Sequence, residues 1–558
     1  MLVQFEIPLN YRFLFFLLAL LPKKIVHLCE GEAPWIYRQR LGCPSTSLQS
    51  QSTRSSKVKR AVSSQMGLFG VLPFLLVSCI TFLLILIRRR DATKGKLPPG
   101  PTPLPLVGNL LQLNIWDIIA SFQKVSEQYG SVFTVYMGSR PIVVLCGYGT
   151  IKEALIDNAE AFGGRGLMMG MDESIRDYGV VSTNGERWRQ LRRFSLTTLR
   201  NFGMGKRSIE ERIQEEAQFL VEALRKTEGH PFDPTFYLSH AVSNVICSVV
   251  FGQRFEYEDK QFVFLLDVIN KSFRLMFSTA SQMKNFFPGL MRILPGPHQE
   301  VPKYMKKLIN FISQRVQIHR ESFDPNCPRD FIDCFLAKME QEKENPTSEF
   351  HNENLAVTVL NLFFAGTETV STTLRYRLLI LLRYPEIEAK VQEEIDRVIG
   401  RNRSPSLEDR SQMPFTDAVI HEIQRFIDVS PLAPPHSVTC DTHFRGFSIP
   451  KGTTVVPFLS SCLHDPQHFQ TPRKFNPQHF LDERGSFRKN EASLPFSTGK
   501  RVCLGEGLAR MELFLFLTTV LQNCHLKSLQ EREEIDISAD VRGSSKLPPP
   551  YNLCMVPR

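Results

Sequence analysis

The sequence predicts a mainly α-helical protein with small β-sheets at its margins. Apolar side chains recur at helical spacing over most of residues 150–430, with Pro- and Gly-rich breaks between segments. Short runs typical of strands lie at residues 131–137, 141–146, 442–449 and 453–459. We therefore expect one large helical domain that a few strands border.

Composition and cysteine spacing restrict the class of protein. The chain has 558 residues, 42% of them apolar, and its 42 Phe can build a large core. Its twelve cysteines include no C-x-x-C pair, so they predict neither a zinc cluster nor a disulfide framework. Reduced thiols facing the cytosol fit this pattern best.

The net charge of +10 belongs to the N-terminal segments. Residues 1–65 carry nine Lys/Arg against three Asp/Glu, and residues 66–96 carry five against one. From residue 97 onward the two signs balance at 53 each. The globular part therefore has no excess of positive charge, and a nucleic-acid partner is not supported.

A transmembrane anchor is expected over residues 66–90. Residues 67–87 are almost wholly apolar and long enough to span a bilayer as a helix. Arg88, Arg89 and Arg90 follow at once, which predicts that the downstream chain lies in the cytosol. A cleaved signal peptide is the alternative, but no small-residue cleavage site precedes the arginines.

The segments around this anchor have their own compositions. Residues 45–64 are Ser- and Gln-rich and basic, so we expect residues 1–65 to be a disordered extension or an alternative start, with Met66 as the other start. Residues 91–105 read as a basic and Pro-rich linker. The globular domain is expected over residues 106–558, beginning with a helix at 115–129.

Residues 496–505 form the most informative motif, Phe-Ser-Thr-Gly-Lys-Arg-Val-Cys-Leu-Gly. Cys503 stands just before an apolar helical run, where free N–H groups and the helix dipole favour a thiolate. Gly499 and Gly505 allow the backbone to approach something flat, and Arg501 can neutralise an anion. A thiolate ligand of haem iron needs this arrangement, whereas a buried structural cysteine does not.

A long helix is expected over residues 354–384, roughly 45 Å at 1.5 Å per residue. Its apolar run is interrupted by Gly366, Thr367, Glu368 and Thr369. Glycine costs a helix about 1 kcal/mol relative to alanine, and buried polar groups need partners. We interpret this interruption as a groove for dioxygen with groups that deliver protons; a solvated face is the alternative.

Two further pairs gain meaning only from their order along the chain. Trp188 and Arg192 lie four residues apart, and Glu422 and Arg425 lie three apart, which places each pair on one helical face. Either pair alone is ordinary. The order Trp-x-x-x-Arg, Ala-Gly-x-Glu-Thr, Glu-x-x-Arg and then the cysteine loop is not.

This ordered set resembles the cytochrome P450 superfamily over residues 97–558. Runs such as 192–206 and 328–334 are similar to the microsomal family 2, near its 2C and avian 2H subfamilies. The resemblance implies the cytochrome P450 fold, with haem b between a long central helix and the cysteine loop. It also implies a single N-terminal transmembrane helix.

The resemblance assigns roles to individual residues. Cys503 is the expected axial iron ligand, Thr369 would hydrogen-bond dioxygen, and Glu368 would relay protons. The expected haem contacts are Arg165, Trp188, Arg192, Ala365, Thr369, His436, Phe496, Gly499, Arg501, Cys503 and Gly505, of which Arg165, Trp188, Arg192, His436 and Arg501 would hold the propionates.

The Glu-x-x-Arg pair is implied to be structural, together with a third basic residue. Glu422 and Arg425 would lock the loops behind the haem. The family places an arginine in Pro-x-Arg-Phe, where this chain has His479. Because histidine is a weaker donor, we expect a pH-sensitive triad.

Family members receive electrons from an acidic reductase that docks on a basic face. Arg189, Arg193, Arg200 and Lys500 are similar to that face, so NADPH-cytochrome P450 reductase and cytochrome b5 are the expected partners. The apolar segment 285–294 resembles a loop that dips into the membrane, although it could equally pack in the core.

The substrate pocket is expected to include Val181, Ser182, Asn361, Phe364, Ala365, Val429, Ala433 and Ser544. Phe364 would narrow the space over the iron, and Asn361 stands where some relatives carry an acid. Arg377 replaces a small residue in an apolar helix, so it needs a partner or lowers stability.

The resemblance implies a monooxygenase in the endoplasmic reticulum membrane, with its catalytic domain in the cytosol. It would insert one oxygen atom of O2 into a xenobiotic, fatty acid or steroid, using electrons from NADPH. Two alternatives stay open: a haem-thiolate isomerase that needs no reductase, and a non-catalytic haem-binding membrane protein. The intact Ala-Gly-x-Glu-Thr motif counts against both.

Overall fold

The computed structural model describes residues 97–168, 174–201, 207–276, 278–542 and 545–558. The N-terminal extension, the expected anchor, residues 91–96 of the linker and the pocket residue Ser544 lie outside the described residues.

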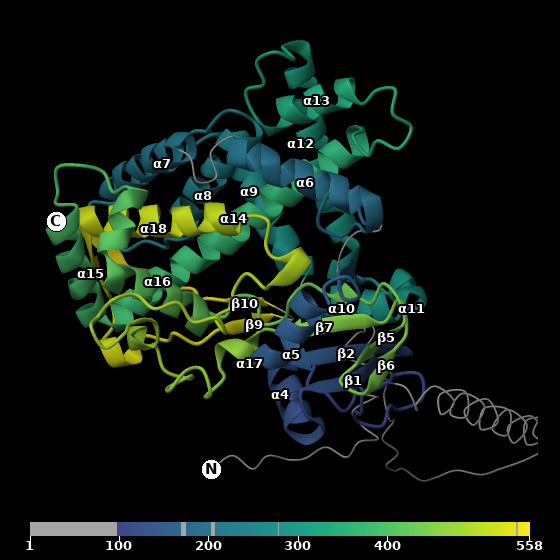
Figure 1. Cartoon of the computed structure of the whole chain (residues 1–558). Helices are drawn as coiled ribbons and strands as arrows, with labels where there is room; N and C mark the ends of the chain where they lie inside the picture. Colours follow the sequence, from purple (N-terminus) through teal and green to yellow (C-terminus); the bar gives the residue numbers. More distant parts are fainter. Residues whose placement is uncertain (1–96, 169–173, 202–206, 277, 543–544) are drawn as a thin grey trace, which may run out of the picture.

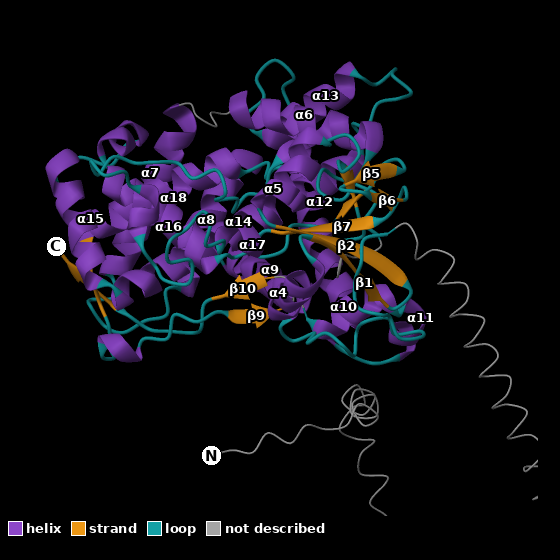
Figure 2. Ribbon diagram, turned by 60° about the horizontal axis from the view of Figure 1, so that its bottom comes forward, coloured by secondary structure: helices purple, strands orange, loops and turns teal. Residues whose placement is uncertain are grey.

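The longer helices are α4 (Ile118–Tyr129), α6 (Gly185–Asn201), α7 (Arg207–Arg225), α8 (Thr235–Val250), α9 (Lys260–Met276), α12 (Val301–Glu321), α13 (Phe331–Gln341), α14 (Asn352–Arg383), α15 (Pro385–Val398), α16 (Pro414–Ile427) and α18 (Glu506–Asn523). Shorter ones are α5 (Tyr148–Lys152), α10 (Thr279–Phe286), α11 (Pro288–Ile293), α17 (Ser460–Leu463), the π-helix η1 (Glu153–Asp157) and the 3-10 helices η2 (Pro297–Gln299), η3 (Leu407–Gln412), η4 (Pro477–Phe480), η5 (Gly499–Arg501) and η6 (Arg532–Glu534). The helices form the bulk of the molecule, and the largest sheet lies at one end (Figures 1 and 2).

Helix α14 is the centre of the helical part and confirms the expected long helix. It packs against α8, α12, α16 and α18, and most of its 32 residues are buried (Figure 1). Within the described residues it is the one helix long and apolar enough to cross a membrane, but its burial inside the protein marks it as a core helix.

Gly366 has a packing role that the sequence did not suggest. A Cβ atom at this position would lie 2.6 Å from Cδ1 of Ile246 on α8, so glycine allows the two helices to approach closely. Thr367, next to it, accepts a hydrogen bond from Ser243 of α8 at 3.1 Å. The Gly-Thr step therefore fastens α8 to α14.

A five-stranded sheet has the order β1-β2-β7-β4-β3. Its strands are β1 (Val132–Met137), β2 (Arg140–Cys146), β7 (Thr454–Phe458), β4 (His436–Ser437) and β3 (Gly164–Arg165). β1 and β2 form an antiparallel hairpin, and β7 joins β2 in parallel. The pairing of β3 with β4 sets Arg165 directly opposite His436, although 270 residues separate them.

The expected strand at 442–449 is instead a hairpin. It consists of β5 (Thr442–Phe444) and β6 (Phe447–Ile449), joined by Arg445 and Gly446 with φ of 49° and 83°. Two successive residues with positive φ are typical of a tight hairpin turn. Two-stranded sheets also pair β9 (Asp540–Arg542) with β10 (Ser545–Leu547) and β8 (Cys524–Lys527) with β11 (Cys554–Pro557).

The Pro-rich stretch at the start of the described chain lies against β1. The backbone N–H of Thr134 donates to the carbonyl of Pro99 at 2.8 Å. A Cβ atom on Gly100 would lie 1.9 Å from the carbonyl oxygen of Thr134, so glycine is required for this contact.

Arg377 is a fully buried cation in α14 and has no carboxylate partner in the part of the chain that the structure describes. Its Nη1 donates to the carbonyl of Leu513 on α18, while its Nε and Nη2 have no hydrogen-bond partner among the described residues. Burial, with the nearby charge of Arg410, lowers the pKa of the guanidinium to about 9, against the opposing effect of Asp417. An incompletely paired buried charge destabilises a fold.

Replacing Arg377 by methionine should therefore stabilise the protein. We expect Arg377→Met to raise the free energy of unfolding by about 1–3 kcal/mol, because unpaired buried polar groups carry that penalty. Denaturant unfolding of the haem-bound protein measures the change. Arg383→Met, at the half-buried end of the same helix, where the guanidinium donates to the carbonyl of Arg532, is the control and should not raise the stability. Lower stability of Arg377→Met would show that the Leu513 contact outweighs desolvation.

Candidate active site

The loop that carries Cys503 is held by close backbone contacts. The Cys503 N–H donates to the carbonyl of Phe496 at 3.0 Å. Gly499 has a φ of 76°, and a Cβ atom there would lie 2.1 Å from the carbonyl oxygen of Leu155 in η1. Both facts require glycine at this position. Gly505, two residues after the cysteine, is the N-cap of α18.

The Cys503 side chain is exposed, but many protein atoms surround its sulfur and reduce its contact with bulk water. Burial raises the pKa of this thiol, and the nearby Glu506 carboxylate adds to the effect. The N–H groups of Gly505 and Glu506 and the charge of Arg192 act in the opposite direction. The helix end thus lowers the pKa of Cys503 as expected, but burial raises this pKa by more. A further positive charge, such as a metal ion, would favour the thiolate.

Two residues break the burial of α14 at its midpoint. Ala365 and Thr369 are exposed although their neighbours Phe363, Thr367 and Val370 are buried. They lie four residues apart, so they form one open strip on the helix. The Thr369 hydroxyl donates to the carbonyl of Ala365 at 2.8 Å. The Thr369 oxygen keeps lone pairs with which it can accept a further hydrogen bond.

Glu368 is a buried carboxyl group whose pKa is close to neutral pH. Burial raises its pKa to about 7, while the charges of Arg375 and Arg274 lower it. Its Oε1 has no hydrogen-bond partner among the described residues. A carboxyl group with such a pKa can both give and take a proton at neutral pH.

Arg501 lies at the centre of a cationic cluster. Its guanidinium packs over the ring of Trp188 at 3.8 Å from the centroid. It donates to the carbonyls of Gly163 at 3.0 Å and Thr183 at 2.9 Å, and to Oδ1 of Asn184 at 2.9 Å. Its buried Nη1 has no partner among the described residues.

Arg165 and Arg192 complete the cluster. Burial and these two neighbouring cations lower the pKa of Arg501 to about 8, and burial with Arg192 lowers that of Arg165 to about 10. Arg192 donates to the carbonyl of Val502 at 2.7 Å, one residue before the cysteine. Three guanidinium groups held by neutral acceptors form a site for an anion.

His436 faces this cluster from β4. Its Nδ1 lies 2.8 Å from the carbonyl of Phe162, so Nδ1 carries the proton. Burial, with the charges of Arg165 and Arg501, lowers its pKa to about 3. Without an anion beside it, His436 is therefore neutral and its Nε2 is an acceptor.

Glu422, Arg425 and His479 meet as the sequence motif implied. Arg425 makes a bidentate pair with Glu422, with both bonds at 2.7 Å. Glu422 also accepts from the N–H of Asn476 at 2.8 Å and from Nδ1 of His479 at 3.1 Å. The Thr471 N–H donates to Nε2 of His479 at 3.2 Å. Arg425 also donates to the carbonyls of Leu463, Pro472 and Lys474.

Comparison with known proteins agrees with this geometry. The family model "Cytochrome P450" matches residues 98–555. The chain belongs to the cytochrome P450 family. It is 56% identical over 494 residues to cytochrome P450 2G1 of Rattus norvegicus, covering 88% of this chain and 100% of the relative. Cytochrome P450 2H2 of Gallus gallus is 54% identical over 493 residues (88% and 100%), and cytochrome P450 2C20 of Macaca fascicularis is 56% identical over 487 residues (87% and 99%).

The resemblance to family 2 is therefore confirmed, and 2G1 is a similar relative that the motifs did not single out. Cytochromes P450 bind haem b through a cysteine thiolate and act as monooxygenases, so this chain is a haem-thiolate monooxygenase. The relatives give no support to an isomerase or a non-catalytic haem protein. The residues at the site fit the cofactor, because the unpaired Nη1 of Arg501 and its cationic neighbours suit a carboxylate-bearing group beside Cys503.

An apolar cavity of about 350 Å³ adjoins the open strip of α14. It includes most of the pocket residues expected from the resemblance, namely Val181, Asn361, Phe364, Ala365, Val429 and Ala433. Ser182 does not line it, since this side chain is buried and its hydroxyl donates to the carbonyl of Arg176 at 2.7 Å.

Many lining residues could not be recognised in the sequence. They come from the N-terminal part of the domain and from α9, α10 and α12, and they include Leu110, Ile115, Ile118, Phe122, Met137, Phe273, Met276, Met283, Phe286, Val301 and Met305. Apolar residues at helical spacing look the same whether they face a core or a cavity.

The expected docking face lies largely on one side of α6. Arg189, Arg193 and Arg200 are exposed, and their spacing of four and seven residues places them on one helical face. Arg189 pairs with Glu186 one turn before it. Lys500 is also exposed and pairs with Glu160. Both pairs reduce the net charge of this face.

Breaking the Glu422–Arg425 pair should be severe. We expect Arg425→Leu to lower the free energy of unfolding by about 3–5 kcal/mol, because it removes the counter-charge of the buried Glu422 carboxylate and leaves it only the Asn476 N–H and His479 as donors. The yield of haem-bound protein and its denaturant midpoint measure the loss. Arg401→Leu removes an exposed pair with Asp396 and should change stability by at most about 0.5 kcal/mol. Equal effects of the two variants would contradict a structural role for the buried pair.

Proposed function

We propose that this monooxygenase is bound to the endoplasmic reticulum membrane, takes electrons from NADPH through cytochrome P450 reductase, and oxygenates lipophilic small molecules. The observation that carries the proposal is the cationic cluster of Arg165, Arg192 and Arg501 beside Cys503, together with the open Thr369 strip on α14. A carboxylate-bearing, metal-containing cofactor satisfies both the cations and the thiol.

Cys503 would be the iron ligand, and haem b bound there would supply the activation of dioxygen. The propionate groups would be held by Arg165, Trp188, Arg192, His436 and Arg501. An adjacent anion favours the protonated form of His436, which turns its Nε2 from an acceptor into a donor. Ala365, Phe496, Gly499 and Gly505 form the nonpolar and backbone parts of the cradle.

Thr369 and Glu368 deliver protons on the side of α14. Thr369 stands on the open strip with a hydroxyl oriented by the Ala365 carbonyl, so it can accept and pass on a proton. Glu368, the next residue, has a buried carboxyl with one unpaired oxygen and a pKa of about 7. This pair supplies protons without opening the cavity to bulk water.

The cavity favours compact apolar substrates that carry a hydrogen-bond acceptor. Phe364 packs against Phe273 with ring centroids 5.8 Å apart, which gives one wall two aromatic faces. Oδ1 of Asn361 accepts from the N–H groups of Val180 at 3.1 Å and Val181 at 3.2 Å. These bonds fix the amide so that its NH2 group is the end available to a ligand. Xenobiotics, fatty acids and steroids remain the proposed substrate classes.

The reductase, with cytochrome b5 as a second partner, docks on Arg189, Arg193, Arg200 and Lys500. The anchor at residues 66–90 holds the catalytic domain on the cytosolic side. The exposed side chains of Leu290 and Ile293 on α11 suit contact with the membrane surface.

Cys503→Ser tests the ligand assignment. We expect this variant to lose the red-shifted Soret band that the reduced, carbon-monoxide-bound protein shows when the axial ligand is a thiolate. Cys440→Ser changes an exposed cysteine outside the site and should keep the band. Loss of the reductase-dependent product should accompany loss of the band. A Cys503→Ser protein that kept the thiolate spectrum would overturn the assignment.

Glu368→Gln tests proton delivery through its pH dependence. Since the pKa of Glu368 is raised to about 7, the wild-type carboxyl loses its proton as pH rises through that value. We expect product formed per NADPH to fall between about pH 6 and about pH 8 in the wild type, and to be low and flat in Glu368→Gln. Glu353→Gln, exposed on the first turn of α14, should retain the wild-type profile. An unchanged profile in Glu368→Gln would remove this residue from the proton path.

A further inference from the structure

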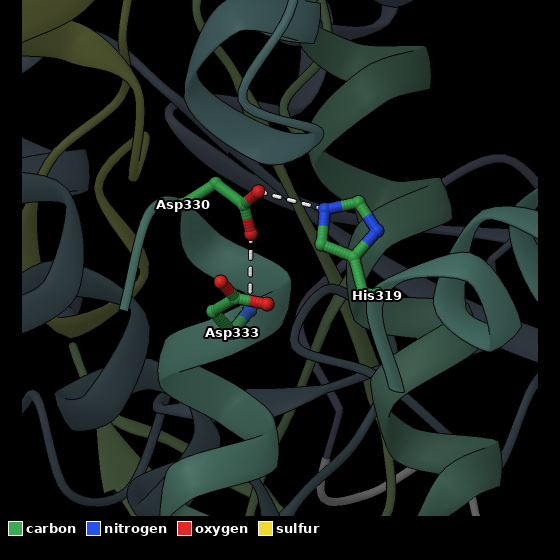
Figure 3. A group of neighbouring side chains, drawn as sticks. All are labelled: His319, Asp330 and Asp333. Carbon is green, nitrogen blue, oxygen red and sulfur yellow. Dashed lines mark hydrogen bonds and ion pairs between the residues drawn. The ribbon is translucent and has the colours of Figure 1, made fainter. Parts of the chain in front are cut away.

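His319, Asp330 and Asp333 gather where the end of α12 meets the start of α13. Figure 3 shows the imidazole of His319 on α12 pointing at the carboxylate of Asp330, with Asp333 one turn into α13. All three side chains are buried, and their ligand atoms lie within 4.8 Å of one another. The set has the residue types of a metal site.

The carboxylate oxygens of this cluster already accept hydrogen bonds, so they are not free ligands for a metal ion. Asp333 Oδ2 accepts from the backbone N–H and Nε of Arg329 at 3.2 and 2.6 Å, and Oδ1 accepts from Nη2 at 3.1 Å. Oδ1 of Asp330 accepts from the Asp333 N–H at 3.0 Å. Each carboxylate is therefore already engaged as a cap or in an ion pair, and the site offers no free ligand set.

The two ring nitrogens of His319 decide what the cluster is. Nδ1 lies 2.7 Å from the carbonyl oxygen of Arg315, which can only accept. Nε2 lies 2.7 Å from Oδ2 of Asp330, which also accepts. Both nitrogens therefore carry a proton, and a doubly protonated imidazole has no lone pair for a metal.

We propose that His319 is a buried imidazolium that, with Asp330, forms a pH-sensitive clasp between α12 and α13. His319 lies in the last turn of α12, where the helix dipole favours a cation. Asp330 is the N-cap of α13, where the dipole favours an anion. The two helix ends thus stabilise opposite charges that meet at 2.7 Å.

The clasp matters for the cavity because α12 forms part of its wall. Val301 and Met305 near the start of α12 line the cavity, while His319 fastens its other end. The chain just after α8 packs against the His319–Asp330 pair. A Cβ atom on Gly252 would lie 2.8 Å from Oδ2 of Asp330, so this segment approaches the carboxylate closely, and glycine brings no charge to it.

The charged neighbours on each element determine the direction of the pKa shift. Burial lowers the pKa of His319, but hydrogen bonds to Asp330 and Arg315, with the charges of Asp330 and Asp333, raise it above its ordinary value overall. The Arg329 guanidinium is bound to Asp333, and the Arg315 guanidinium lies over the rings of Phe255 and Phe311. Burial and the same two carboxylates raise the pKa of the Cys334 thiol to about 11, so it stays neutral.

The sign of the pH effect follows from this shift. A histidine with a raised pKa in the folded state contributes its full stability below its unfolded pKa of about 6.5. That contribution is lost as pH rises through the folded value. The clasp is therefore closed in mildly acidic solution and weakens in alkaline solution.

Hydrogen exchange of the haem-bound full chain tests the proposal. His319→Gln keeps one donor but no charge, and we expect several-fold faster exchange in the last turn of α12 and the first turn of α13 at about pH 6.5. The ratio of the exchange rates to wild type should fall toward unity as the pH is raised through the folded-state pKa of His319, because the wild-type imidazolium then loses its proton. Asp330→Asn should give the same pattern, and His351→Gln, which removes a more exposed pair with Glu353, should not.

Two further measurements guard against a purely structural explanation. The imidazole resonance that His319→Gln removes should show both nitrogens protonated at neutral pH, and added zinc should leave it unchanged. A difference in exchange that stayed constant with pH would overturn the imidazolium clasp. So would a neutral ring at pH 6.5, or zinc-dependent protection of α12 that Asp333→Asn abolished.

Discussion

The site depends on one electrostatic constraint, which is that the buried Arg165 and Arg501 and the half-buried Arg192 lie together with no carboxylate partner among the described residues. Main-chain carbonyls hold them in place, so their positions do not depend on a counter-ion within the protein. Burial lowers the pKa values of Arg165 and Arg501, repulsion from their cationic neighbours adds to the effect, and a bound anion would oppose it. The cationic cluster can therefore bind carboxylates next to the thiol. A cofactor that binds there would add to the stability of the folded state.

Arg425 and Arg377 show that burial alone does not determine what a charge does. Both side chains are fully buried, but Arg425 binds Glu422 and three carbonyls, whereas Arg377 donates, among the described residues, only to the carbonyl of Leu513. Arg425 therefore holds the loops behind the site together, whereas Arg377 destabilises the central helix α14. The same reasoning identifies His319 as a charged partner of Asp330, because each of its nitrogens meets an acceptor.

Local signals in the sequence were sufficient to predict those features whose structure needs particular residue types at fixed spacing. The cysteine loop, the polar break in α14 and the strands β1, β2 and β7 could be predicted, since each needs particular residue types at fixed spacing. The single strand at 442–449 was wrong, because the turn at Arg445 and Gly446 breaks it. Gly366 was noticed, but its close contact with Ile246 depends on a helix more than a hundred residues away. Such long-range contacts have no local signature.

The same distinction separates the chemistry of this enzyme from its choice of substrate. The groups proposed for oxygen chemistry lie in short motifs, whereas the cavity wall is assembled from α9, α10, α12 and the N-terminal part of the domain. Asn361 joins the two, because it lies two turns before Thr369 and its amide is oriented by the backbone of Val180 and Val181. A change in that loop would turn the amide and alter which substrates bind, while leaving the cysteine loop and the proton-delivering pair intact. Substrate preference can therefore depend on residues outside the motifs that carry the proposed oxygen chemistry.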